Sequence, residues 1–397
     1  MTNRHLLRIV LIVLAVLALT VFGAAAQGEP AGQSPVTNWN ETEPNNDFAS
    51  ADNLHQLGDV TAGRLGAFGD VDYFKVSTEY GQHLLFDLDV PAGSFLTWPS
   101  ICVYDAFFEE LACNTDGDLY YEPLLFYSGY GGMLYVSVED WSGGGGAGYD
   151  YRLTVYSPLF VSAATGGTVA GVPFAAGDVL AHYDFPDGTE RWQMFFDASD
   201  VGIAGNLTSL TLHIEQRMHA VFAGNPTVYL NGAPVTLLPY HYTTFMLEHP
   251  GQTTAGYFAG VSDVRPYGLN AASEKLDALT INGSIPILST TGAAAAPWLG
   301  RAQDEDLFET YSAGFFDGTA VRGLGVEDVI AAEWDWNADV LYLTILGSGV
   351  IDGQRYNQKD IFMVGHQSHQ VLGRYWNGPA HHFTYNIDAF ELGWDER

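Results

Sequence analysis

The chain of 397 residues carries 47 acidic and only 15 basic side chains, a formal net charge of −32. A field of that sign repels nucleic acids and anionic membrane surfaces, which excludes both as partners, although divalent cations stay compatible. The alternative to a specific cationic ligand is that the charge only keeps the surface solvated, as suits an extracellular or salty setting. The chain has 45 glycines, which recur between short β-rich runs, and 14% of its residues are aromatic. This composition favours an all-β protein, and the length suggests two domains.

The first 26 residues have the pattern of a secretory signal peptide. Arg4 and Arg8 precede an apolar run over 9–22, and Ala24–Ala26 forms a small-residue cleavage site. The run is short for a membrane span, which needs about 20 residues, although an uncleaved anchor is the alternative. No later segment is long and apolar enough to span. We therefore expect a protein that is secreted or held at the cell surface.

Residues 27–40 are rich in Gly, Pro, Ser and Asn and are predicted to be a linker. Residues 41–156 then alternate apolar and polar side chains with a period of two, which predicts an antiparallel β-sandwich. The expected strands are 73–80, 83–90, 100–107, 133–140 and 149–157, with a glycine-rich hairpin tip at 141–148.

The only two cysteines are Cys102 and Cys113. If a hairpin turns at Phe107 and Phe108, the two thiols lie opposite each other, and export then favours a disulfide. Two buried free thiols are the alternative.

Residues 159–397 repeat with a period of about sixty residues, in four copies of four short strands. The first strand of each copy is predicted at 207–214, 276–283, 329–336 and 387–394. Units of four short strands favour a small four-bladed propeller. The alternative is an ordinary sandwich whose strands resemble one another by chance.

Oxygen-bearing side chains gather in "ETEPNND", residues 41–47, and again at "GDVDYF", residues 69–74. Calcium takes six to eight oxygen ligands from carboxylates, amides and backbone, so a calcium site can be built from Glu41, Glu43, Asn45, Asn46, Asp70 and Asp72. An acidic turn with an Asx cap beside a solvated loop is the alternative. A cation at "NTDGD", residues 114–118, is a second possibility.

The order of "ETEPNNDFASADNL", "GDVDYFKV", "GQHLLFDLDV" and "YDYRLTV" resembles the bacterial pre-peptidase C-terminal domain over residues 41–156. The resemblance implies a β-sandwich on a secreted enzyme, similar to the collagen-binding modules of clostridial collagenases, with the acidic segment wrapped back to bind calcium. It places the same six residues as ligands. Asn46 stands where those modules often carry a carboxylate, so we expect weak binding. The later repeats resemble degenerate repeats of exported environmental bacterial proteins.

Motifs for catalysis are largely missing, because the chain has no H-E-x-x-H, G-x-S-x-G or P-loop pattern. The late histidines His366 and His369 would face opposite sides of a strand, which argues against a metal site built from them and from His381 and His382. Repeat carboxylates at Asp200, Asp263, Asp328 and Asp388 are read as structural caps, with glycoside hydrolysis as the alternative.

These observations favour a secreted binding or adhesion protein without enzymatic activity, in which the repeat domain presents a surface that recognises an extracellular protein or glycan polymer. A secreted hydrolase and a purely structural surface module are the rival functions.

Overall fold

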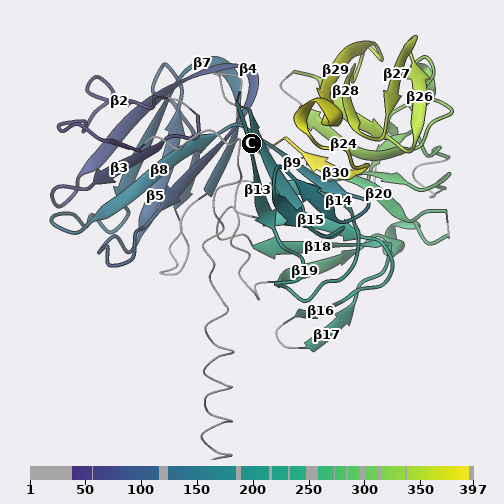
Figure 1. Ribbon diagram of the computed structural model, residues 1–397, viewed down its shortest axis with the longest axis horizontal. Coiled ribbons are helices and arrows are strands. Elements are labelled where there is room, and N and C mark those ends of the chain that lie inside the picture. Colours follow the sequence, from purple (N-terminus) through teal and green to yellow (C-terminus); the bar gives the residue numbers. More distant parts are fainter. Residues whose placement is uncertain are drawn as a thin grey trace, which may run out of the picture.

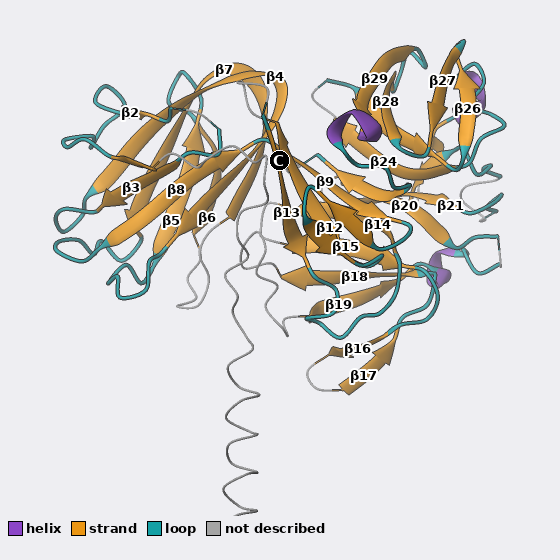
Figure 2. Cartoon of the chain, viewed as in Figure 1, coloured by secondary structure: helices purple, strands orange, loops and turns teal. Residues whose placement is uncertain are grey.

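The computed structural model describes residues 38–392, except 56, 116–123, 185–188, 214–216, 231–232, 247–257, 272, 283–284, 296–300, 311–313 and 336–337. The expected signal peptide, most of the linker and part of the 114–118 segment lie outside the described residues. The described residues form mostly strands, and their only helices are three short 3-10 helices (Figure 2). Among these residues, no helix has the length and apolar character that a membrane crossing needs.

The N-terminal region is an eight-stranded sheet with the order β1-β3-β8-β4-β7-β5-β6, and β2 pairs with β4 (Figure 1). Its strands are β1 (Asn38–Asn40), β2 (Asp52–Asn53), β3 (Val60–Arg64), β4 (Val71–Asp89), β5 (Pro99–Tyr104), β6 (Glu110–Thr115), β7 (Leu124–Asp140) and β8 (Asp150–Tyr156). The pairs β1–β3 and β2–β4 are parallel, and the rest are antiparallel. β1 begins inside the segment predicted as a linker.

The long strands β4 and β7 let one sheet form both layers of a sandwich. The sequence was read as two strands at 73–80 and 83–90, but β4 runs through both, with a register shift between Tyr80 and His83. A bulge bends a strand without reversing it, so the chain bends at Gly81–Gln82 and continues as one strand. Phe74 on the first half and Phe86 on the second are both fully buried in one apolar core.

The predicted hairpin forms between β5 and β6. Cys102 and Cys113 are directly paired across it, and their sulfur atoms form a disulfide. Phe108 takes a left-handed backbone conformation at the turn. The pairing expected from a turn at Phe107 and Phe108 is therefore confirmed.

The C-terminal region contains four four-stranded sheets (Figure 1), which confirms the all-β expectation. Their orders are β13-β12-β9-β30, β14-β15-β18-β19, β20-β21-β22-β23 and β24-β25-β28-β29. The strands of the first two are β9 (Pro158–Ala163), β12 (Val179–Asp184), β13 (Glu190–Phe196), β30 (Ile387–Glu391), β14 (Leu207–His213), β15 (Arg217–Phe222), β18 (His241–Met246) and β19 (Phe258–Asp263). Those of the last two are β20 (Leu276–Asn282), β21 (Ile285–Thr290), β22 (Leu307–Glu309), β23 (Gly314–Phe316), β24 (Val329–Asp335), β25 (Val340–Ile345), β28 (Asp360–Gly365) and β29 (Val371–Asn377).

Smaller elements decorate the repeat. Three of the sheets in the repeat region carry a small hairpin between their second and third strands, which the sequence analysis did not predict. These hairpins are β10 (Gly167–Val169) with β11 (Val172–Phe174), β16 (Thr227–Leu230) with β17 (Ala233–Thr236), and β26 (Ser348–Ile351) with β27 (Gln354–Asn357). The 3-10 helices η1 (Arg265–Tyr267), η2 (Gly318–Ala320) and η3 (Gly378–His381) follow β19, β23 and β29.

The first strands of the four copies meet in cyclic order. β14 packs against β20, β20 against β24, β24 against β30, and β30 against β14. β30 pairs antiparallel with β9, so residues 387–391 complete the sheet that begins at residue 158. The first sheet therefore combines the start and the end of the repeat region.

The fifth residue of each of these four strands is polar and buried: Thr211, Thr280, Glu333 and Glu391. Thr280 donates a 3.0 Å hydrogen bond to Glu333 Oε2, and the Leu212 amide donates at 3.2 Å to Glu391 Oε2. Burial raises the pKa of Glu391 to about 7. Burial also raises the pKa of Glu333 well above its ordinary value, and the charge of Glu391 adds to that rise. The repeat thus places two carboxyl groups side by side where its sheets meet.

The two regions join with a single residue, Ser157, between β8 and β9. Leu85 on β4 points away from the sandwich core and is fully buried against residues of the repeat region, including Phe160. The ring of Tyr156 lies 4.7 Å from that of Tyr183. A shared apolar contact therefore continues across the junction.

Candidate metal centres

The acidic segment 41–47 lies along the sandwich and is held by its backbone. The Glu41 amide donates to the Ala62 carbonyl at 3.0 Å, and the Tyr73 amide donates to the Asn45 carbonyl at 2.9 Å. These two bonds place the segment against β3 and β4. The six predicted ligands therefore come from this acidic segment, from Asp70 in the loop before β4, and from Asp72 at the start of β4.

Three of these residues form the centre of the cluster. One carboxylate oxygen from each of Glu43, Asp70 and Asp72 lies within 4.8 Å of the others. The side chain of Asn45 is fully buried, and one of its terminal atoms is 3.1 Å from both Asp72 Oδ1 and Glu43 Oε2. With nitrogen in that position, Asn45 donates two hydrogen bonds, whereas with oxygen there, three oxygens converge as calcium ligands do.

The remaining members surround this centre. The hydroxyl oxygen of Tyr151 lies 2.8 Å from Glu41 Oε2 and 2.6 Å from Asp72 Oδ2, and it donates its single proton to one of these carboxyl groups at a time. Asn46 donates to Asp70. Burial, and then the nearby charge of Glu41, raise the pKa of Asp72 to about 9. Buried carboxylates with raised pKa values favour either protons or a cation between them. The structure brings all six predicted residues together, and the binding of a cation by them stays a prediction.

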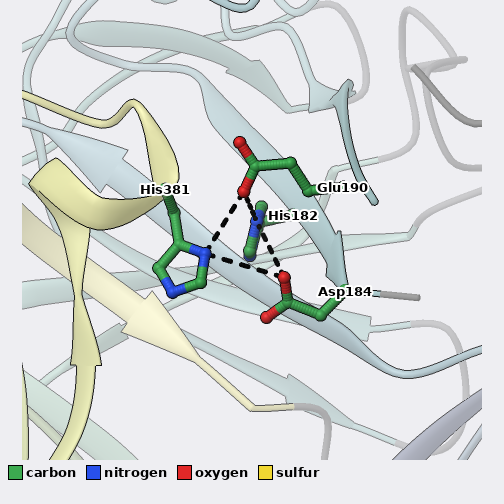
Figure 3. A group of neighbouring side chains, drawn as sticks. All are labelled: His182, Asp184, Glu190 and His381. Carbon is green, nitrogen blue, oxygen red and sulfur yellow. Dashed lines mark hydrogen bonds and ion pairs between the residues drawn. The ribbon is translucent and has the colours of Figure 1, made fainter. Parts of the chain in front are cut away.

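A second cluster lies in the repeat region and combines histidines with carboxylates: His182, Asp184, Glu190 and His381 (Figure 3). His182 and Asp184 are two residues apart on β12, so their side chains share a face. Glu190 opens β13 directly opposite Asp184. His381 ends η3, and β29 and β30 flank that turn.

Four short distances connect these side chains. His182 Nε2 is 3.0 Å from Glu190 Oε2 and 3.6 Å from Asp184 Oδ1. His381 Nδ1 is 3.2 Å from the same glutamate oxygen and 3.6 Å from the same aspartate oxygen. The hydrogen bond from His182 lowers the pKa of Glu190 the most and His381 lowers it further, whereas burial acts in the opposite direction and raises it. All four groups therefore face one small volume.

Aromatic rings hold both histidines. His182 is 2% exposed, and its ring lies 4.5 Å from that of Trp192. The ring of His381 stacks on Trp376 at 5.5 Å, and Trp192 Nε1 donates to the His381 carbonyl at 3.2 Å. Asp184 is the exposed member, with 60% of its side chain accessible. The cluster is thus rigid on its apolar side and open to solvent at Asp184.

Sequence reasoning named His381 but missed its partners. The spacing of His182, Asp184 and Glu190 around a short connection was a usable local signal, because residues i and i+2 of a strand share a face. Their proximity to His381 depends on the closure of the repeat by β30. His366 lies apart from this cluster and pairs with Asp339 at 2.9 Å.

The repeat carboxylates proposed as caps have local partners. Asp263 pairs with Arg265 at 2.7 Å and accepts from its backbone amide. Asp388 accepts from the Gln358 side chain at 3.2 Å, and from Asn206. Asp317 plays the same capping role before η2. These contacts give Asp263 and Asp388 structural partners, and a hydrolytic role for the repeat carboxylates stays an untested alternative.

Comparisons with known proteins find neither a matching family model nor a matching curated protein. A solved pre-peptidase C-terminal domain of collagenase from Bacillus anthracis is 13% identical, with a TM-score of 0.21, covering 31% of this chain and 97% of that chain. The GH74 enzyme of Niastella koreensis is 12% identical, with a TM-score of 0.24, over 54% and 38%. A protein of unknown function from Bacteroides caccae is 7% identical, with a TM-score of 0.28, over 60% and 100%. At these scores the likenesses carry no argument about activity.

Proposed function

We propose that the chain is an extracellular binding protein without enzymatic activity, which uses a calcium-stabilised sandwich to hold an extracellular protein or glycan polymer. The repeat region is then a four-bladed propeller that supports the sandwich. The four sheets and the cyclic packing of their first strands support this arrangement, as does the completion of the first sheet by β30.

The observation that carries the binding proposal is the short loop between β3 and β4. Asp70 in this loop belongs to the oxygen cluster and accepts a hydrogen bond from the Gly66 amide, while Phe68, two residues earlier, is 84% exposed. Calcium held by Asp70 would therefore order the segment that presents Phe68. Exposed aromatic rings are costly in water and offer faces for stacking on a ligand.

Two further exposed aromatics lie on loops bonded together at the same end of the sandwich. Trp141 is 68% exposed and Phe95 is 61% exposed. The Gly69 amide donates to the Gly143 carbonyl at 2.8 Å, and the Phe95 amide donates to Gly148 at 2.7 Å. The loops that carry the three aromatic side chains thus form one bonded unit beside the oxygen cluster. We call Phe68, Phe95 and Trp141 the aromatic rim.

The test is binding of the protein to a panel of insoluble extracellular polymers, with calcium and with chelator. We expect retention on at least one polymer in calcium, and its loss in Phe68→Ala/Trp141→Ala. Phe107→Ala is the matched control, because Phe107 is 83% exposed at the other end of β5. Retention that survives loss of the rim would contradict the proposed surface, and absence of retention on every polymer would contradict the binding function.

The calcium site is tested separately by thermal unfolding. At a hundredfold excess over Kd, calcium should stabilise the sandwich by about 2.7 kcal/mol, with Kd on the order of 10⁻⁴ M, as in many extracellular modules. Glu41→Gln/Glu43→Gln should abolish the shift, and Glu109→Gln, an exposed acid in the same domain, should retain it. Equal midpoints in calcium and chelator for the wild type would remove calcium from the proposal.

A further inference from the structure

We propose that His182, Asp184, Glu190 and His381 bind one divalent transition-metal ion, with zinc the best fit. This site is independent of the calcium site and of the aromatic rim, because it lies in the repeat region and uses a different set of ligand atoms (Figure 3).

The spacing of the ligand atoms fits one tetrahedral ion. With zinc bonds of about 2.0–2.1 Å to imidazole nitrogen and carboxylate oxygen, neighbouring ligand atoms of a tetrahedron lie about 3.4 Å apart. The four nitrogen–oxygen distances in the cluster are 3.0, 3.2, 3.6 and 3.6 Å. Each of the four atoms also lies within 4.8 Å of all the others, so one ion at the centre can reach every one of them.

A network of hydrogen bonds accounts for this arrangement less completely. The facing nitrogen of each imidazole has at most one proton, yet two carboxylate oxygens lie within 3.6 Å of it. A cation at the centre satisfies all of these lone pairs at once. It also neutralises two carboxylates in a chain whose formal net charge is −32, where their mutual repulsion is otherwise opposed only by the histidines.

The choice of metal follows from the ligand types. Two imidazole nitrogens and two carboxylate oxygens suit zinc and neighbouring first-row metals, whereas calcium prefers six to eight oxygens. Trp192 and Trp376 fix the orientation of the imidazole rings, which lowers the cost of organising the site. The exposed side chain of Asp184 leaves an entry path from solvent.

The ion would connect parts of the repeat that are remote in sequence. His182, Asp184 and Glu190 belong to the first sheet, while His381 lies in the connection from the fourth sheet to β30. Zinc would thus clamp the ends of the repeat region beside the β9–β30 pair. Binding to the folded state alone raises stability by mass action, so zinc should raise the unfolding midpoint of the repeat region.

The experiment is zinc titration of the full chain by calorimetry in excess calcium, which occupies the oxygen cluster. We expect one zinc ion per chain at the proposed site. His381→Ala and Glu190→Gln should each weaken its binding at least about tenfold. His366→Gln is the matched control, because His366 forms a 2.9 Å pair with a single carboxylate outside the cluster and should leave zinc binding unchanged.

Cobalt(II) provides a second readout that a structural role alone would not give. Tetrahedral cobalt absorbs strongly in the visible range, and we expect this band with the wild type and with His366→Gln but not with His381→Ala. Circular dichroism checks that His381→Ala is folded, and Glu190→Gln replaces it if it is not. Wild-type protein that binds no zinc, or variants that bind zinc as tightly as the wild type, would show a hydrogen-bonded network only and overturn the proposal.

Discussion

The sandwich and the repeat region each gather charged side chains into a cluster, but they assemble those clusters differently. The oxygen cluster combines side chains of the acidic segment 41–47 with Asp70 and Asp72, all within residues 41–72. The histidine–carboxylate cluster needs residues almost two hundred positions apart in the chain, His182 and His381. The first cluster therefore forms within one short part of the chain, and the second forms only when β30 has paired with β9.

This difference teaches which perturbations should affect each region. The sandwich has its own apolar core around Phe74 and Phe86, and its own disulfide. The repeat region distributes its core over several sheets and depends on β30 to complete the first of them. If the regions are energetically separate, changes at the closure of the repeat should leave the calcium response of the sandwich unchanged.

The largest expected effect follows from removing the indole ring of Trp192, which packs where the end of the repeat region meets its first sheet. Trp192 is 1% exposed and stacks on Phe383 with ring centres 5.5 Å apart. Trp192→Ala should destabilise the repeat region by about 3–5 kcal/mol through lost burial and the resulting cavity. Calorimetric unfolding should show the transition of the repeat region shifted down, with the calcium-dependent transition unmoved. A single merged transition that moves as a whole would break the comparison.

The next effect concerns pH and the paired carboxyl groups of Glu333 and Glu391. An acid whose pKa is raised on folding keeps its proton in the native state while the unfolded chain releases it, so stability falls as pH rises. With the pKa of Glu391 near 7 against an ordinary 4.5, the loss between those two pH values is about 3 kcal/mol. Denaturant unfolding of wild type and Glu391→Gln at pH 4.5 and pH 8 checks this.

Glu391→Gln should be less sensitive to pH than the wild type by about that amount, and Glu109→Gln should behave like the wild type. Identical pH slopes for all three proteins would show that Glu391 titrates normally in the folded state.

A somewhat smaller effect is expected from the disulfide. Opening the Cys102–Cys113 link, which closes a short hairpin, should destabilise the sandwich by about 2–3 kcal/mol. Thermal unfolding of Cys102→Ala/Cys113→Ala should show a lower midpoint for the sandwich and an unchanged one for the repeat region. An equal shift in both transitions would mean that the junction at Ser157 couples them fully.

The smallest effect should come from a surface ion pair. Arg64 and Asp150 are 2.6 Å apart, but both side chains are about half exposed, and such pairs contribute about 0–1 kcal/mol. Arg64→Ala should therefore change the unfolding free energy of the sandwich by less than about 1 kcal/mol. A larger loss, measured by denaturant unfolding, would indicate that the pair also holds the acidic segment over the oxygen cluster.

Much of the architecture could be predicted from the sequence because it depends on local periodicity. The four copies of four strands and the pairing of Cys102 with Cys113 follow from alternation and turn position. The strand β4 was misread, because a glycine in a bulge and a glycine in a turn look alike in sequence.

The two clusters differ in predictability for the same reason. Glu41 and Glu43 lie in one short acidic segment and Asp70 and Asp72 in the next, so the number of oxygens that calcium needs, together with the family resemblance, indicated that the two segments meet. His182 and His381 meet because β30 pairs with β9, a contact of high sequence separation that no local pattern encodes. The four buried polar residues at the fifth position of β14, β20, β24 and β30 could likewise be recognised only once the bounds of these strands were known.

The single-residue junction at Ser157 has a mechanical consequence. Tension applied by a polymer bound to the sandwich would pass directly from β8 into β9, since no flexible spacer lies between them. β9 is hydrogen-bonded antiparallel to β12 on one side and to β30 on the other. A pull along β9 therefore loads both rows of hydrogen bonds in shear, so that many must break together instead of one after another. The junction would therefore transmit force to the repeat region without first extending a flexible linker.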